Sequence, residues 1–236
     1  IKTLSDNAPF VTIGIVGVAE SVSELIGHHQ SLERCLKQIE MPRMSKDELR
    51  SIISTGLERL NVQMEGQMRE EIVIFSSGFP HFTHLLAKYS VKECLARGSR
   101  SVNKEDYETA ISKAIENSSQ SIRENYQQAT IAAKTKSKFE DVIWACALAE
   151  CDEHETFSTK DLVDPYRVVT GEQIEPGSIS YNIGELCKDR KGKILERIGE
   201  SKNIRFRFKN PLMKVFVKLK AAQAGTALQP SLFRPN

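Results

Sequence analysis

Residues 204–209 read Ile204-Arg205-Phe206-Arg207-Phe208-Lys209, a strict alternation of apolar and basic side chains. Because side chains alternate across a strand, this pattern predicts a strand with one face toward a small core and a basic face outward. We expect a second strand of the same kind at residues 193–198 (Lys193-Ile194-Leu195-Glu196-Arg197-Ile198), and turn-forming residues join the two at 199–203. We therefore expect a β-hairpin with a cationic outer face.

Charge is unevenly distributed along the chain. Residues 180–220 contain twelve Lys and Arg against four Asp and Glu, whereas the whole chain of 236 residues carries a formal net charge of only +2. A basic segment on an acidic body is typical of a module that faces a polyanion. The alternative interpretation is an ordinary solvated surface hairpin.

The cysteines and histidines indicate the compartment. Five cysteines form no CxxC pair, and the HxxH spacing of His81 and His84 has no further ligand nearby. We expect reduced core cysteines in a cytoplasmic protein, and no metal site. No apolar run reaches membrane-spanning length and no signal peptide is present, so a membrane is not an expected partner. The chain begins with Ile1 rather than Met, and we expect it to be part of a longer parent.

The N-terminal segment has a different character from the rest. Residues 10–18 form an apolar, β-rich run without clear alternation, which predicts a strand buried on both faces of a parallel sheet. Such a strand needs parallel neighbours, and these are expected before Ile1. Residues 1–42 are therefore assigned to the end of a larger α/β core.

Residues 43–134 predict a bundle of four helices. Ser45 and Glu48 form a capping box, Pro80 suits a first helical position, and Asn103 caps a long fourth helix that runs to Tyr126. The polar run at 134–138 indicates a hinge.

Residues 135–222 predict three helices, the hairpin and a closing helix. The first helix carries Trp144, the second is capped by Ser158, and the last opens at Pro211. The third begins at Ser178 and is expected to expose Ser180, Tyr181, Gly184, Glu185 and Lys188. This order of elements is that of a winged-helix domain, with a flexible tail at 223–236. The whole chain is expected to be mainly α with a small β component.

The order of the parts resembles the C-terminal half of an AAA+ ATPase, in particular the origin-recognition and transposition-accessory ATPases and the related STAND group. Residues 13–20 resemble the fourth core strand and the sensor-1 loop, and residues 31–34 resemble the helix that carries an arginine finger. The turn Gly78-Phe79-Pro80-His81 resembles the sensor-2 region in its STAND-like Gly-x-Pro form. The resemblance implies a remnant of a P-loop α/β core, a four-helix lid and a winged helix.

The same resemblance implies functional residues. Arg34 corresponds to the arginine finger, which acts across a subunit boundary and so implies a homo-oligomer. The residues placed near ATP and Mg²⁺ of the parent protein are Glu20, Ser21, Gly78, Pro80 and His81. The usual sensor-1 asparagine and sensor-2 arginine are missing, and His81 stands in place of the latter.

No G-x-x-x-x-G-K-[ST] loop and no Walker B strand occurs in the sequence. The chain alone is therefore not expected to hydrolyse ATP. Activity would belong to the parent protein, with its N-terminal ATPase core as the partner of this part.

Duplex DNA is the expected ligand of the winged helix. The outer face of the third helix is a weak set for base reading, since Arg, Asn and Gln make most base-specific contacts. We expect sequence-tolerant contacts with phosphates instead. The candidate residues are Lys188, Arg190, Lys191, Lys193, Arg197, Lys202, Arg205, Arg207 and Lys209.

Two alternatives remain open. The winged helix of the same ATPase portion can be a protein-docking module whose basic face serves an acidic partner. The chain can also be a stand-alone winged-helix regulator with a helical ligand or dimerisation domain. The apolar run at 10–18 argues against the regulator, because a regulator has no need for half a parallel sheet.

Overall fold

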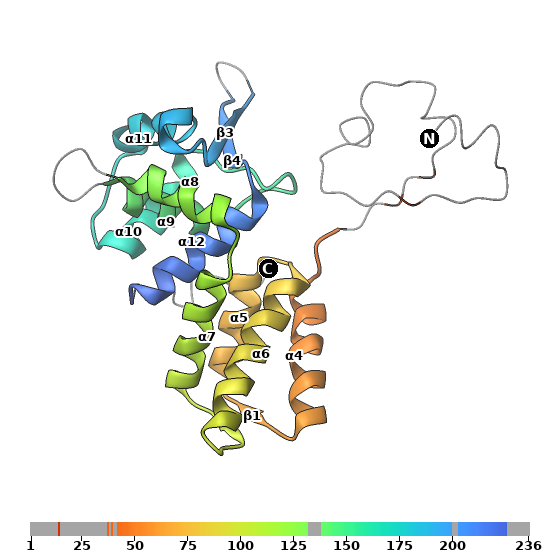
Figure 1. Ribbon diagram of the computed structural model, residues 1–236. Helices are drawn as coiled ribbons and strands as arrows, with labels where there is room; N and C mark the ends of the chain where they lie inside the picture. Colours follow the sequence, from red (N-terminus) through yellow and green to blue (C-terminus); the bar gives the residue numbers. More distant parts are fainter. Residues whose placement is uncertain are drawn as a thin grey trace. The chain divides into compact units, whose positions relative to one another are not determined.

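The computed structural model describes residues 42–131, 138–199 and 203–225, together with Gly14, Lys37 and Ile39. The chain divides into two compact units, Ile1–Pro42 and Arg43–Asn236, and every element below belongs to the second. It is mainly helical with a small β component, as the sequence predicts, and this component consists of two small sheets (Figure 1). The run at 10–18, Glu20, Ser21 and Arg34 lie outside the described residues. Within those residues, no helix combines the length and apolar character needed to cross a membrane.

The first helices form the bundle: α4 (Lys46–Leu60), α5 (Gly66–Ser76), α6 (Pro80–Ala96) and α7 (Lys104–Glu116). Three of them, α4, α6 and α7, begin where Ser45, Pro80 and Asn103 predict. Ser45 forms its capping box with Glu48, and Asn103 forms a second one with Asp106. Helices α4, α5 and α6 contact one another, and α7 packs along α6.

A two-stranded parallel sheet, which the sequence analysis does not predict, joins the loops of this bundle. Strand β1 (Gln63–Met64) pairs with β2 (Ser101–Val102) in the register Gln63↔Ser101. Two residues are too few to show any periodicity in the sequence. The sheet connects the chain after α4 to the chain before α7.

The prediction of one long fourth helix is wrong, because the segment forms two helices. Helix α7 ends at Glu116 and a separate α8 spans Gln120–Thr130. Polar side chains make the break: Ser119 accepts a hydrogen bond from the backbone of Ile122, and Asn117 donates to the carbonyl of Lys113 (2.7 Å). Helix α8 contacts α9 (Lys138–Leu148) and α12 (Pro211–Gln223).

The C-terminal elements follow in the predicted order. After α9 come α10 (Val163–Thr170), α11 (Ser180–Leu186), the hairpin of β3 (Leu195–Ile198) and β4 (Arg205–Phe208), and α12. The helix expected directly after Ser158 starts as a 3₁₀ turn, Lys160–Leu162. Phe157 adds one bridge to the hairpin, because its backbone N–H and carbonyl each bond to Phe206 at 2.8 Å. Helix α12 reaches Gln223, the first residue of the expected tail.

The hairpin register confirms one strand pattern and overturns the other. Phe206 and Phe208 are buried, as the alternation predicts. In β3, however, Leu195 faces the core opposite Phe208, while the exposed Arg197 lies opposite Phe206. The outer face of the hairpin therefore is not uniformly basic, since Glu196 lies opposite Arg207 and Ile198 opposite Arg205.

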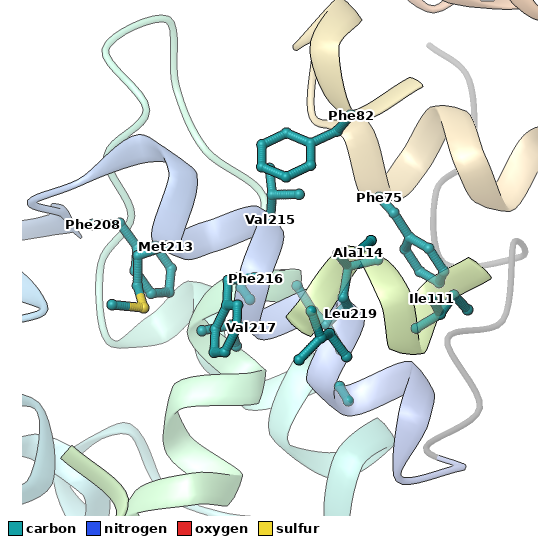
Figure 2. Close-up of a cluster of buried hydrophobic side chains, with 14 of the residues drawn as sticks. Phe75, Phe82, Ile111, Ala114, Phe208, Met213, Val215, Phe216, Val217 and Leu219 are labelled. Carbon is teal, nitrogen blue, oxygen red and sulfur yellow. The ribbon is translucent and has the colours of Figure 1, made fainter. Parts of the chain in front are cut away.

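Helix α12 carries the core that all these elements share. Its buried residues Val215, Phe216 and Leu219 belong to one cluster with side chains of the bundle and of the hairpin. Figure 2 shows them with Phe75 of α5, Ile111 and Ala114 of α7, and Phe208 of β4. Helix α12 contacts α5, α7, α8, α9 and β4, so it links the N-terminal bundle to the C-terminal elements.

A group of polar side chains on α12, at the end of α5 and in the loop before Phe157 lies beside this core. Lys218 of α12 is 6% exposed, and its ammonium group donates to the carbonyl of Ile74 (3.0 Å) and to Ser77 Oγ (2.9 Å) at the end of α5. Glu155, in the loop before Phe157, pairs with Arg43 (2.8 Å) and Lys214 (3.0 Å) beside it. Burial, together with the nearby charge of Lys214, lowers the pKa of Lys218 to about 7, and the charge of Glu155 offsets only part of this shift.

The buried Lys218 makes the free energy of unfolding depend on pH. The pKa of Lys218 is about 7 in the folded chain and about 10.5 when the side chain is exposed. Between these values the unfolded chain holds a proton that the folded chain lacks, so stability rises with pH. We expect the free energy of unfolding to increase by about 2 kcal/mol between pH 7 and pH 9 from this group. Urea titrations of the wild type and Lys218→Met measure it, and parallel pH profiles of the two proteins would contradict it.

Candidate nucleic-acid interface

The turn between α5 and α6 packs closely against the chain that enters α4. Gly78 has φ of +81°, and a Cβ placed there would lie 2.7 Å from Cβ of Arg43. The carbonyl of Gly78 accepts from the N–H of Met44 (3.0 Å), and the N–H of Phe79 donates to the carbonyl of Ser76 (2.8 Å). Pro80 is the first residue of α6. These contacts make the turn a close joint between the two helices.

His81 lies exposed in the first turn of α6, with its ring edge-on to Phe82 at 5.3 Å between centroids. Arg43 instead covers the turn, with its guanidinium 4.6 Å from the ring centroid of Phe79 and a bond to the carbonyl of Ser77. No group of three or more His, Cys, Asp and Glu that would suit a metal ion occurs among the described residues.

The structure divides the candidate DNA-binding residues into two sets by exposure. Lys191, Arg205 and Arg207 are half-buried, and Lys202 lies outside the described residues. The exposed set, called here the basic rim, consists of Lys188, Arg190, Lys193, Arg197 and Lys209.

Backbone hydrogen bonds place Lys188, Lys193 and Lys209 of the basic rim at the base of the hairpin, while Arg197 lies farther along β3, opposite Phe206. The N–H of Lys193 donates to the carbonyl of Lys188 (3.1 Å), which closes the turn after α11. The N–H of Lys209 donates to the carbonyl of Ile194 (3.0 Å) across the hairpin. Lys193, Arg197 and Lys209 make no side-chain hydrogen bond or ion pair to another described residue. Their charges are therefore available to a ligand.

The half-buried set is used inside the protein. Lys191 donates to the carbonyls of Ala129 (3.2 Å) and Ile131 (2.7 Å) at the end of α8, where a cation is favoured by the helix dipole. Its ammonium also lies 4.1 Å from the ring centroid of Phe139. Arg207 pairs with Glu196 on the neighbouring strand.

Arg205 ties the hairpin to the loop before Phe157. Its guanidinium donates to the carbonyl of Thr156 (2.8 Å) and to Thr156 Oγ1, and pairs with Asp152 (3.0 Å). Asp152 in turn accepts from the N–H and hydroxyl of Thr156, and these bonds lower the pKa of Asp152 below its usual value. The alternation at 204–209 predicts a free outer face for Arg205 and carries no information about this loop, which is distant in sequence.

The predicted exposed face of α11 is wrong at Glu185. It was expected to be exposed, but its side chain is only 5% exposed, while Ser180 and Tyr181 are exposed as predicted. One carboxylate oxygen accepts from Lys188 (2.7 Å), and the other pairs with Arg190. The bond from Lys188, with that from Arg190, lowers the pKa of Glu185 below its usual value, so the carboxylate stays ionised at neutral pH.

No protein-family model matches the chain, and no curated protein matches it in sequence. The basic rim is chemically suited to bind phosphate oxygens, because lysine and arginine donate charge-assisted hydrogen bonds to them. Few groups suited to reading base edges lie beside it, since α11 exposes mainly Ser180 and Tyr181.

The bonds of Arg205 predict a structural role for it. Arg205→Ala removes its bonds to Asp152 and Thr156, and we expect a loss of about 1–2 kcal/mol in the free energy of unfolding. Lys209→Ala, at an exposed position just after the same strand, should change it by less than about 0.5 kcal/mol. Urea denaturation of the two variants makes the comparison, and equal stabilities would show that the Arg205 contacts contribute nothing.

The close approach at Gly78 predicts a second difference in stability. Gly78→Ala introduces both a strained positive φ and a collision with Arg43, so we expect a loss of about 2–4 kcal/mol. Gly98→Ala is the matched control, because Gly98 has φ of +75° but nothing within 4 Å of an added Cβ. It should lose only about 1 kcal/mol. Thermal or urea unfolding distinguishes them, and equal losses would exclude the collision as a cause.

Proposed function

We propose that residues 138–223 form a winged helix that binds duplex DNA through phosphate contacts of the basic rim. The observation that carries this proposal is the exposed set of Lys193 and Lys209 at the base of the hairpin and Arg197 farther along β3. These cations are unpaired within the described residues, while the half-buried cations beside them are used internally. A surface that keeps such charges free is suited to a polyanion.

The order of elements supports the winged-helix assignment. Helix α9 is followed by the bridge at Phe157, by α10 and α11, and then by the β3–β4 hairpin. In a winged helix of this order, α11 would be the helix presented to DNA and the hairpin would be the wing. The weak base-reading face of α11 favours sequence-tolerant binding.

The bundle fits the second half of the proposal, a lid of an AAA+ ATPase. Helices α4 to α7 precede the winged helix, and the joint at Gly78 and Pro80 lies at the sensor-2-like position. The ATP-binding core of the same protein would then be the partner of this part, and ATP and Mg²⁺ its cofactors. The packing of α12 against both halves suits a coupling between nucleotide state and DNA binding.

Fluorescence anisotropy with a random-sequence duplex, titrated from low to physiological salt, tests DNA binding. The triple variant Lys193→Ala/Arg197→Ala/Lys209→Ala should bind about a hundredfold more weakly at low salt. Its log–log salt dependence should be flatter by about two to three units, because three phosphate contacts are lost.

The control variant removes the same charge elsewhere. Lys46, Lys88 and Lys92 are exposed on the bundle and make no ion pair within the described residues, so their replacement by Ala should leave binding unchanged. Equal weakening by both triple variants would show a general charge effect and exclude the basic rim as the binding surface.

A protein-docking role is the second candidate, and Tyr181 is the observation that favours it. Its side chain is 69% exposed on α11, and exposed tyrosines are enriched at protein interfaces. The absence of duplex binding at low salt would favour this candidate, with an acidic protein as the partner of the basic rim.

A further inference from the structure

Glu185 differs from the carboxylate of an ordinary surface ion pair, because it is nearly buried while its partners are exposed. It is a nearly buried carboxylate at the end of α11, while both of its partners are more than half exposed: Lys188 at 57% and Arg190 at 63%. The two partners engage different oxygens of the same carboxylate. Two cations therefore converge on one fixed anion.

This arrangement matches the way two cations grip a phosphate group. A phosphate, like a carboxylate, offers separate oxygens to separate donors, and lysine and arginine bind either anion. The turn after α11 fixes the spacing of the two donors, because Lys188 leads into the 3₁₀ turn Asp189–Lys191 that contains Arg190. The same turn brings Lys193 beside them through its bond to the carbonyl of Lys188.

We propose that Lys188 and Arg190 form an anion site for a DNA phosphate, and that Glu185 masks this site by holding both cations in ion pairs. The inference rests on the proposed function and deepens it. Lys193, Arg197 and Lys209, which are unpaired within the described residues, provide the first contacts. Lys188 and Arg190 contribute only when a phosphate replaces Glu185 as their partner, so Glu185 limits the affinity of the interface.

The variant Glu185→Gln tests the mask, since glutamine has nearly the same shape and lacks the charge. We expect duplex binding about five- to tenfold tighter at physiological salt, and a log–log salt dependence steeper by about one to two units. Glu175→Gln is the matched control: it removes the same charge from an exposed carboxylate that makes no ion pair within the described residues. It should change the slope by less than about one unit.

A second pair of variants separates the mask from a simple gain in net charge. Lys188→Ala/Arg190→Ala should weaken binding strongly in the Glu185→Gln background and only slightly in the wild-type background, because Glu185 already holds these cations. Equal effects in the two backgrounds would overturn the inference. Both partners are exposed, so Glu185→Gln leaves no buried unpaired charge, and thermal denaturation confirms that each variant is folded.

A titration with inorganic pyrophosphate distinguishes failure of the mask from failure of DNA binding. Amide NMR shifts of residues 188–191, around the two masked cations, should respond to pyrophosphate more strongly in Glu185→Gln than in the wild type. If the wild type does not bind duplex but Glu185→Gln responds more strongly to pyrophosphate, the masked anion site stands and the proposed function fails. If the wild type binds duplex and Glu185→Gln neither binds it more tightly nor responds more strongly to pyrophosphate, the mask is wrong and the proposed function stands.

Discussion

The packing of α12 is the constraint on which the rest of the structure depends. One face of this helix covers the ends of α5 and α7, and its neighbouring residues close the core beneath the hairpin. Lys218 fixes the depth of the packing, because its buried ammonium must reach the carbonyl of Ile74 and the hydroxyl of Ser77. A buried lysine is unfavourable unless it is hydrogen-bonded, so the helix cannot slide or rotate without leaving that group unsatisfied.

The loop before Phe157 joins this core to the hairpin. In this short segment, Asp152 and Thr156 hold Arg205 of β4, while Glu155 holds Arg43 and Lys214. Glu155 adopts φ of +58°, a conformation that a non-glycine residue takes at a cost and that its two ion pairs help to offset. Arg43 also packs over Gly78 and Phe79, so the same loop connects the chain entering α4, the α5–α6 turn and the hairpin.

Local signals in the sequence predicted most of the elements, and contacts between distant segments account for several of the failures. The caps at Ser45 and Asn103 and the alternation at 204–209 act within a few residues, so they could be read directly. The parallel pairing of β1 and β2 joins segments far apart in the chain and leaves no periodic trace. Arg205 looked free in the sequence because its partner Thr156 is 49 residues away. The N-terminal candidates, including Arg34, remain predictions.

The number of basic residues in a segment overstates the number of cations that its surface leaves unpaired for a ligand. Twelve basic residues at 180–220 predict a strongly cationic segment, but within the described residues most of the candidate cations already face an internal anion or a helix end. Pairing of this kind contributes little to stability, because exposed cations are well hydrated with or without a partner. Its main effect is on recognition, since a paired cation must exchange its carboxylate for a phosphate before it contributes. The free set of Lys193, Arg197 and Lys209 thus determines where a polyanion first contacts the surface, and the carboxylates determine how tightly the surface can hold it.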